Sequence, residues 1–296
     1  MSSFYKILFA ASLWGFAGPF IKWINLQPTS TVFFRFSIPL LAILIQSFIT
    51  QRRIKFRADK TLLFASFTDS IRMFTFLLGF TYTSIGNAVI VFYTWPIFVM
   101  IFSSFILKEK INQLKLLMIS LSFVGILIIF SQKSISYSTS DLLGMLAVLI
   151  SAILNAFCIV IYKTKSTEYD RTDIIFYQNF MGAFLFLPFI FINRPFPSME
   201  QTFLGIGYGF LIGYFCYLFF FPALKEMNAS IASILAYVEV VSAVIIGILF
   251  FNESLSLQTL IGGLLIISSV IIIKLNEYRE GITLTKILSY WPFKVK

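Results

Sequence analysis

The sequence predicts an all-α integral membrane protein in which ten transmembrane helices form two inverted five-helix repeats. Hydrophobic residues make up 58% of the chain and charged residues only 12%, whereas soluble domains carry about 25% charged residues. The apolar residues gather in runs close to the roughly 20 residues that a helix needs to cross a bilayer. In addition, the two halves of the chain match each other at a constant offset, which places Ala88 on Ala232 and Tyr93 on Tyr237. A duplicated membrane unit is therefore expected.

Short polar joints separate the apolar segments, and none of these segments resembles a soluble domain. We expect helices rather than strands, because the runs are continuous instead of alternating and an open sheet edge cannot be satisfied in lipid. The predicted spans are residues 4–23, 30–50, 61–81, 86–107, 113–131, 141–162, 173–192, 202–223, 229–251 and 257–274.

The composition excludes several classes of site. The chain has no histidine, which removes histidine-based catalysis and histidine metal sites. Cys158 and Cys216 are isolated within apolar runs, so we expect packing residues rather than a disulfide framework or a zinc site. No metal and no cofactor are expected. The N-terminus has only Lys6 before a long apolar run and no convincing cleavage site, which indicates an uncleaved first helix.

The basic residues predict the orientation in the membrane. The joint between the second and third predicted spans, residues 51–60, holds five lysines and arginines, and such joints stay in the cytoplasm. Because ten is an even number of spans, both termini are then expected in the cytoplasm. The expected location is the cell inner membrane. The net charge of +10 is explained in this way without a nucleic-acid partner. Only three basic residues lie on the outer side, namely Lys22, Lys133 and Arg194.

The internal match defines two copies, residues 1–131 and residues 132–275, followed by a basic cytoplasmic tail over residues 276–296. Each copy contains five spans. Because five is odd, the second copy enters the membrane from the opposite face, and Glu109 and its counterpart Glu253 then lie at opposite ends of the bundle. Inverted repeats are typical of transporters that bind substrate near the midplane between their halves. A duplication without a transport role is the structural alternative.

Short motifs at matching spacing add a resemblance to a family. They are Leu13-Trp14-Gly15, Phe34-Arg35-Phe36, Trp95-Pro96 followed by Glu109, and Glu239 through Asn252-Glu253. With these the chain resembles EamA-type transporters of the drug/metabolite transporter superfamily over residues 4–274. The resemblance implies ten helices, with spans 1–4 and 6–9 around a central cavity and spans 5 and 10 outside. The family usually has Glu-Pro in the ninth span, whereas this chain has Glu239-Val240, so a kink there is left open.

Four ionisable residues within the spans are the first candidates for a substrate site, because charges inside a membrane are costly. They are Arg35, Asp69, Arg72 and Glu239. Our hypothesis is that an arginine receives an anionic group and an acid receives a cationic group, which suits a zwitterion. The alternative is structural pairing, and Asp69 and Arg72 share one helix face. For Arg35, which lies close to the outer interface and could snorkel, we favour a structural role.

Aromatic and amide side chains extend the list of candidates. Trp14, Tyr93, Trp95 and Tyr237 fall near the midplane and either line the site or pack between helices. Asn155, Gln178 and Asn179 bind substrate or a neighbouring helix, and Asn179 stands where the first copy has Arg35. Glu239 could also take up a proton during the transport cycle.

Glycines and prolines mark close packing and interruptions. Gly205, Gly209 and Gly213 form a stripe at four-residue spacing, which lets helices approach closely. Pro19, Pro39, Pro188 and Pro222 can kink their helices, and Trp95-Pro96 is the best candidate for a hinge or broken helix.

The leading hypothesis is a secondary transporter that moves a small polar metabolite by alternating access, with proton coupling or exchange. An amino acid or an amino-acid-like zwitterion fits the charges, and the resemblance also admits S-adenosylmethionine. The substrate and the lipid bilayer are the expected partners, and the expected state is a monomer or homodimer. One alternative is a multidrug or metabolite exporter of the same fold. Another is a membrane-embedded lipid-modifying enzyme, which the absence of histidine and of an acidic metal cluster disfavours.

Overall fold

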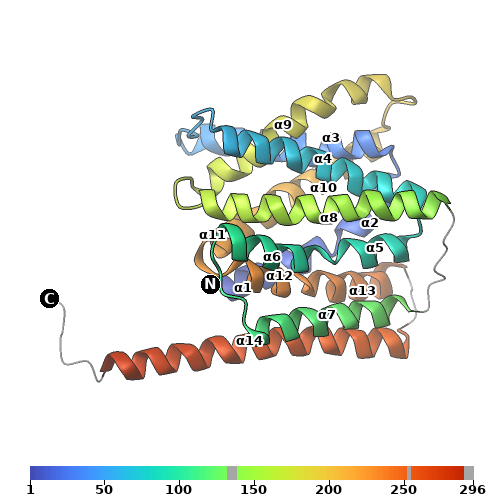
Figure 1. The fold of residues 1–296 in the computed structure, drawn as a ribbon. Coiled ribbons are helices and arrows are strands. Elements are labelled where there is room, and N and C mark those ends of the chain that lie inside the picture. The colour runs from blue at the N-terminus through green and yellow to red at the C-terminus, as the bar shows by residue number, and fades with distance from the viewer. Residues whose placement is uncertain (132–138, 252–254, 290–296) are drawn as a thin grey trace.

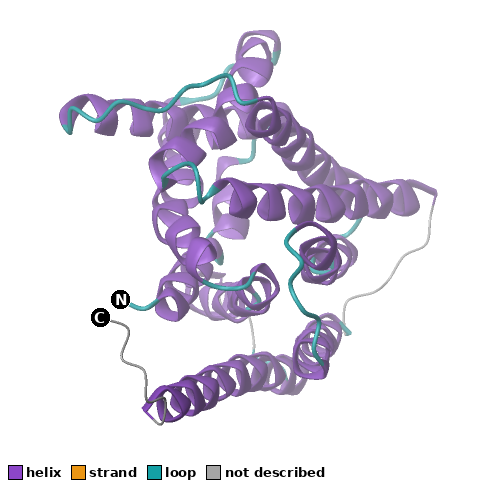
Figure 2. Cartoon of the chain, turned by 60° about the vertical axis from the view of Figure 1, so that its left-hand side comes forward, coloured by secondary structure: helices purple, strands orange, loops and turns teal. Residues whose placement is uncertain are grey.

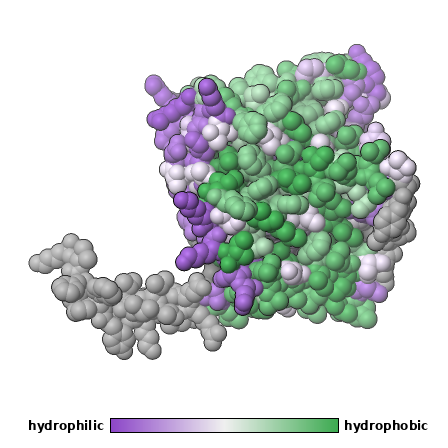
Figure 3. All heavy atoms as spheres, in the orientation of Figure 1, coloured by the Kyte–Doolittle hydropathy of each residue, from purple (hydrophilic) through white to green (hydrophobic). Residues whose placement is uncertain are grey.

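A computed structural model describes residues 1–131, 139–251 and 255–289, with side chains up to Asn276 except that of Ile85. Its described residues form helices and no strands, and ten helical segments are long and apolar enough to cross a membrane. The helices run side by side along one direction (Figure 1). A hydrophobic band covers their middle, between two hydrophilic ends (Figure 3). The predicted all-α membrane fold is thus confirmed.

The observed spans agree with the predicted ones to within a few residues. Five spans are single helices: span 2 is α3 (Pro28–Ile49), span 3 is α4 (Lys60–Tyr82), span 5 is α7 (Gln113–Phe130), span 6 is α8 (Thr139–Lys165) and span 7 is α9 (Arg171–Ile192). Four spans are divided: span 1 into α1 (Ser3–Trp14) and α2 (Ala17–Ile24), span 4 into α5 (Ile85–Phe92) and α6 (Trp95–Ile106), span 8 into α10 (Met199–Tyr208), the π-helical η1 (Gly209–Phe215) and α11 (Cys216–Glu226), and span 9 into α12 (Ala229–Ala236) and α13 (Val238–Phe251). Span 10 is the first part of α14 (Leu257–Ser289).

Polar side chains begin several of these helices, as expected where backbone N–H groups lack helical partners. The Asp59 carboxylate accepts hydrogen bonds from the first turn of α4, and the Ser84 hydroxyl accepts one from the Asn87 amide in α5. Ser198 and Gln201 form a capping box at the start of α10. These caps explain why the polar joints end the spans where they do.

The C-terminal helix α14 continues beyond the predicted end of span 10 at residue 274. Its backbone is helical as far as Ser289, and the helix extends past the rest of the bundle (Figure 1). The predicted tail over residues 276–296 is therefore mostly helical. Residues 290–296 lie outside the described part, as do Asn252 and Glu253.

The packing of the two halves is reciprocal. Span 3 packs on span 6, as span 8 packs on span 1, and span 3 packs on span 7, as span 8 packs on span 2. Span 6 begins at the end of the bundle opposite to the N-terminus, so spans 1 and 6 run in opposite directions (Figure 1). Arg35 contacts Asn179, and Tyr237 contacts Tyr93, and each pair is separated by the same 144 residues. These relations are consistent with the inverted repeat that the sequence predicts.

Spans 5 and 10 form a separate pair at one edge of the bundle. Figure 1 shows α7 and α14 together there, and the turned view in Figure 2 keeps the C-terminal helix at the edge. The two helices touch where Gly125 faces Gly262, because a Cβ on Gly125 would lie 2.6 Å from the Gly262 carbonyl oxygen. The Ser122 and Ser269 hydroxyls hydrogen bond beside this contact at 2.5 Å. This arrangement matches the one that the family resemblance implies.

Spans 4 and 9 are interrupted at equivalent positions, Tyr93 and Tyr237. In span 4, Pro96 has no N–H to donate to the preceding turn. The Ile97 amide bonds to the Thr94 carbonyl at 3.0 Å, which leaves the Tyr93 carbonyl without a helical donor. The Tyr237 hydroxyl donates to that carbonyl at 2.8 Å. The predicted break at Trp95-Pro96 is confirmed, and span 9 is interrupted without a proline.

Span 1 is interrupted at Gly15, and another span satisfies the freed backbone there as well. The Phe16 amide bonds to the Leu13 carbonyl at 3.0 Å, so the Ser12 carbonyl loses its usual helical donor. The Ser242 hydroxyl in α13 donates to the Ser12 carbonyl at 2.5 Å. An interruption in lipid is stable only with such partners.

We predict opposite effects for alanine at two adjacent glycines of α14. A Cβ at Gly262 meets the Gly125 backbone, whereas a Cβ at Gly263 meets nothing within 4 Å. Gly262→Ala should therefore separate spans 5 and 10 and lower the thermal unfolding midpoint in detergent by several degrees. Gly263→Ala should leave it equal or slightly higher, because alanine favours helix by roughly 1 kcal/mol. Equal shifts in both variants would contradict the close contact.

Candidate functional site

The candidate site begins with an ion pair buried in span 3. The Arg72 Nε donates to Asp69 Oδ1 one turn away, and the two side chains are only 7% and 2% exposed. The predicted local pairing is therefore confirmed. The other carboxylate oxygen, Asp69 Oδ2, is buried and has no hydrogen-bond partner among the described residues. One of the two oxygens of this carboxylate therefore makes no hydrogen bond within the described part of the chain.

Arg35 lies inside the bundle and does not snorkel to the outer interface. It is 2% exposed, and its Nη1 donates to Asn179 Oδ1 at 3.2 Å. Its guanidinium also lies over the Tyr217 ring at 5.2 Å. A Cβ on Gly213 would lie 2.8 Å from Arg35 Nη1, so the glycine leaves room for the guanidinium. The side chain turns inward because span 7 supplies an acceptor and span 8 supplies space.

Glu239 stands at the start of α13, directly after the interruption at Tyr237. It is half-buried and lies close to the Tyr93 side chain of span 4. It also interacts electrostatically with Tyr208 and Cys216 of span 8, so it points into the bundle. No lysine or arginine of the described residues forms a salt bridge with it. Within that part of the chain, Glu239 is an acid inside the bundle without a basic partner.

Three of these charges, far apart in the sequence, lie within electrostatic range of one tyrosine. Tyr208 is 1% exposed and interacts electrostatically with Arg35, Arg72 and Glu239. Tyr217, on the same span, interacts with Arg72 and stacks on Arg35. The structure therefore brings three of the four predicted ionisable residues around span 8, and the fourth is paired to Arg72.

Sequence reasoning missed Tyr208 and Tyr217. At the helical period of 3.6 residues, positions nine apart lie on opposite faces. The π-helical η1 lies between them and has wider turns, which changes the angle between the two side chains. The glycine stripe that contains Gly209 was the available signal that this span packs unusually.

The predicted aromatic residues divide into two groups. Tyr237 is fully buried, caps the Tyr93 carbonyl and lies 6.1 Å from the Tyr93 ring, while Trp95 is 4% exposed and packed in the core. Trp14 is half-buried, and its ring lies 5.3 Å from that of Tyr217. Trp14 thus approaches the Arg35 environment, whereas Tyr237 and Trp95 have clear packing contacts.

The amides behave differently from one another. Asn179 bonds to Arg35 and also donates to the Ile175 carbonyl of its own helix at 2.7 Å. Asn155 is half-buried, and no side-chain hydrogen bond is found for it within the described part of the chain. Gln178 Oε1 and the Tyr162 hydroxyl are buried without partners there. Unpaired buried polar groups are uncommon in folded proteins, and a bound molecule or water is one explanation for them.

At the end of the bundle that holds the N-terminus, here called the basic end, Glu109 joins the two halves. Its carboxylate accepts hydrogen bonds from the Ala229 amide at 2.7 Å and the Ser230 hydroxyl at 2.9 Å, at the N-terminus of α12. Lys163 lies 4.0 Å from Glu109 and donates to the Leu224 carbonyl at 2.8 Å. Spans 4, 6, 8 and 9 are thereby tied together at this end.

Further ion pairs between the halves lie at the same end. Lys165 binds Asp59 at 2.7 Å, and Arg52 pairs with Asp170. Burial acts to raise the pKa of Asp59, but its hydrogen bonds with Lys165 and with backbone amides of α4 outweigh burial, and the pKa lies below its ordinary value. Asp59 therefore stays charged at neutral pH. At the opposite end, the described contacts between the halves are hydrogen bonds rather than ion pairs. Asn193 donates to Thr29, and Thr83 donates to the Asp141 carboxylate.

The Asp69–Arg72 pair makes a prediction about stability. Asp69→Leu leaves a buried guanidinium without its partner, which should cost about 3–5 kcal/mol and give little monodisperse protein. The double variant Asp69→Leu/Arg72→Met removes both charges and should recover most of the thermal unfolding midpoint. Glu239→Gln, which breaks no ion pair, serves as the folded control. If Asp69→Leu unfolds at the wild-type temperature, the pair is not what stabilises Arg72.

Comparison with known proteins identifies the fold and the family. The model of the EamA-like transporter family matches residues 2–131 and 142–275. The uncharacterized transporter YoaV of Bacillus subtilis (strain 168) is 30% identical over 64% of this chain and 66% of its own length. The pseudopaline exporter CntI of Pseudomonas aeruginosa (strain UCBPP-PA14) is 24% identical over 87% of this chain and 89% of its own.

A solved crystal structure supports the fold independently. It aligns with a TM-score of 0.81 over 90% of this chain and 96% of the other, at 13% sequence identity. At such low identity the likeness concerns the fold alone. The family model matches nearly the whole membrane part, and the chain therefore belongs to the EamA-like transporter family.

Proposed function

We propose that this transporter moves a small zwitterionic metabolite across the cell inner membrane by alternating access, with both of its termini in the cytoplasm. An amino acid, an amino-acid-like compound and S-adenosylmethionine are the candidates. The observation that carries the proposal is that Arg35 and Arg72 are buried inside the bundle and Glu239 is half-buried there, all close enough to interact electrostatically with Tyr208. Charges at this depth cost about 2.5–3.5 kcal/mol each on insertion scales, and they are kept where they serve a pathway or a site.

The arrangement of the charges suits a molecule that carries both signs. Glu239 has no salt bridge among the described residues and is half-buried, so it can receive an ammonium group or a proton. Arg35 has a neutral amide as its hydrogen-bond partner, which leaves its positive charge uncompensated by that contact. Arg72 is already paired with Asp69. We therefore assign Glu239 to the cationic group and Arg35 to the carboxylate, with Arg72 as the second, already paired cation of the site.

Alternating access is supported by the arrangement of the two halves. The reciprocal packing of spans fits an inverted duplication, in which one half rocks against the other around a shared site. The contacts of Glu109 and Lys163 join spans 4, 6, 8 and 9 at the basic end, and in the proposed cycle they would close that end. The interruptions in spans 1, 4 and 9 lie beside the candidate site and supply positions where helices can bend.

A second candidate is an exporter of the same fold, which the name of the Pseudomonas aeruginosa relative favours. It differs from the first in direction and substrate rather than in mechanism. A lipid-modifying enzyme receives no support, because the family is one of transporters and the sequence has no histidine.

Glu239→Gln tests the site directly. It should lower counterflow of a radiolabelled amino acid or S-adenosylmethionine in proteoliposomes at least tenfold, since a hydrogen bond to a charged group contributes about 1.5–3 kcal/mol. A thermal-shift screen first identifies which compound binds. Glu200→Gln, at an exposed carboxylate in α10, is the matched control. Wild-type flux with unchanged pH dependence in Glu239→Gln would remove this carboxylate from the mechanism.

Lys163→Met tests closure of the basic end. In a Cys158→Ser background Cys216 is the single thiol, and it lies near Arg35 and Glu239. Loss of the Lys163 contacts should open this end and speed labelling of Cys216 by a charged thiol reagent severalfold. Lys225→Met, at an exposed lysine of the same end, should not change the rate. Slower or unchanged labelling in Lys163→Met would contradict a closing role.

A further inference from the structure

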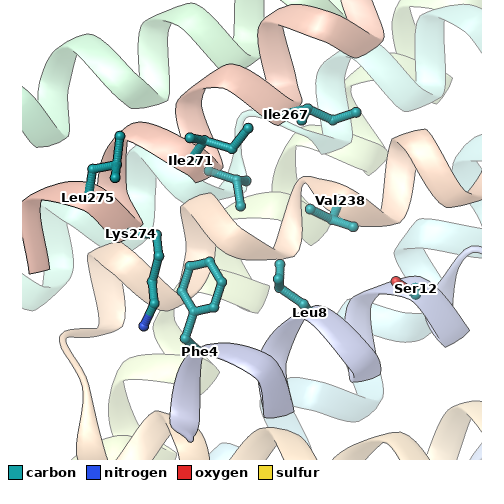
Figure 4. A pocket seen from close by; sticks show the side chains of 9 residues that line it. Phe4, Leu8, Ser12, Val238, Ile267, Ile271, Lys274 and Leu275 are labelled. Atoms are coloured by element: carbon teal, nitrogen blue, oxygen red, sulfur yellow. The ribbon is translucent and has the colours of Figure 1, made fainter. Parts of the chain in front are cut away.

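A groove separate from the candidate site runs along the outside of the bundle between spans 1, 9 and 10 (Figure 4). Its volume is about 390 Å³. The walls are almost entirely apolar, with Phe4 and Leu8 from α1 on one side and Ile267 and Ile271 from α14 on the other. Lys274 brings a positive charge to one end of the groove.

The groove has the depth of one lipid leaflet. From Phe4 to Ser12 it follows eight residues of α1, which is about 12 Å at the helical rise of 1.5 Å per residue. The hydrocarbon core is about 30 Å thick, so one leaflet contributes about 15 Å. Phe4 lies close to the N-terminus, and the groove therefore extends from the basic end of the bundle toward the midplane.

One side of the groove is open to the surrounding hydrocarbon. Ile267, Ile271 and Leu275 on α14 are 40%, 51% and 58% exposed, whereas Phe4 and Val270 are 6% exposed and form its floor. Water in an apolar groove at this depth would find almost no hydrogen-bond partners. An acyl chain is the group that fills such a space.

The positive charge of Lys274, at one end of the groove, indicates which lipid headgroup would bind there. The Lys274 ammonium lies 4.5 Å from the centre of the Phe4 ring and 5.7 Å from that of Tyr5. These contacts hold the ammonium beside the groove, at the basic end of the bundle. Basic side chains between transmembrane helices at the membrane surface are a known means of binding anionic lipid headgroups.

We propose that this groove is a binding site for one anionic phospholipid, with an acyl chain between α1 and α14 and its phosphate at Lys274. The site does not depend on the proposed transport function. Its inner end reaches Val238, which lies between the interruption at Tyr237 and Glu239. A lipid bound here would contact span 9 at the point where the helix is interrupted.

Native mass spectrometry of the detergent-purified chain tests the proposal with phosphatidylglycerol and phosphatidylcholine that have identical acyl chains. We expect one phosphatidylglycerol to be retained at least fivefold more strongly than phosphatidylcholine. Lys274→Gln should abolish this preference, while Lys225→Gln, at an exposed lysine of the same end, should keep it.

Filling the groove provides a second test. Ile267→Trp places a large ring in the groove and should remove the retained lipid, whereas Leu264→Trp, on the same helix and 54% exposed outside the groove, should not. Equal retention of both lipids, or no loss in Ile267→Trp, would overturn the proposal. A chain dimer that forms only when Ile267 is intact would assign the groove to a second copy instead, and would also overturn it.

Discussion

Inside a bilayer each backbone carbonyl must find its hydrogen-bond donor within the protein, and this requirement shapes the centre of the molecule. Spans 1 and 4 are interrupted there, and the donors that satisfy their freed carbonyls come from span 9. The Tyr237 hydroxyl serves Tyr93, and the Ser242 hydroxyl serves Ser12. The Trp14 indole donates to the Ile212 carbonyl of η1 at 3.4 Å. Each of these interruptions is therefore stabilised by a side chain from another span, so the interruptions depend on the packing between spans.

The same contacts place the candidate site. Each capping side chain belongs to a span that also carries a charged or aromatic candidate, so that Tyr237 precedes Glu239 and Trp14 approaches Tyr217. The glycines of span 8 complete the arrangement, because Gly213 leaves the space that the Arg35 guanidinium occupies. Backbone irregularity, small residues and buried charge are concentrated in one region. A ten-helix bundle with regular helices would need none of these three features in order to fold.

The sequence was sufficient for the number of spans, their limits and the break before Pro96, because hydrophobic length and proline act locally. It was also sufficient for the Asp69–Arg72 pair, which is set by helical spacing. It was insufficient for Arg35, whose direction depends on Asn179 and Gly213 from other spans. Tyr208 was missed because the π-helical turns change the phase of span 8. The substrate-binding roles of the ten candidate residues stay a prediction.

The contact between Arg35 and Asn179 has a consequence for the origin of the chain. Residues at corresponding places in the two copies touch each other here, so two separate subunits of identical sequence would have met arginine against arginine. Like charges in a poorly solvated interface repel strongly. A polypeptide that carries both copies can vary one of them alone and can therefore oppose this cation with an amide. The duplication thus permits a buried charge that two identical subunits could not place here.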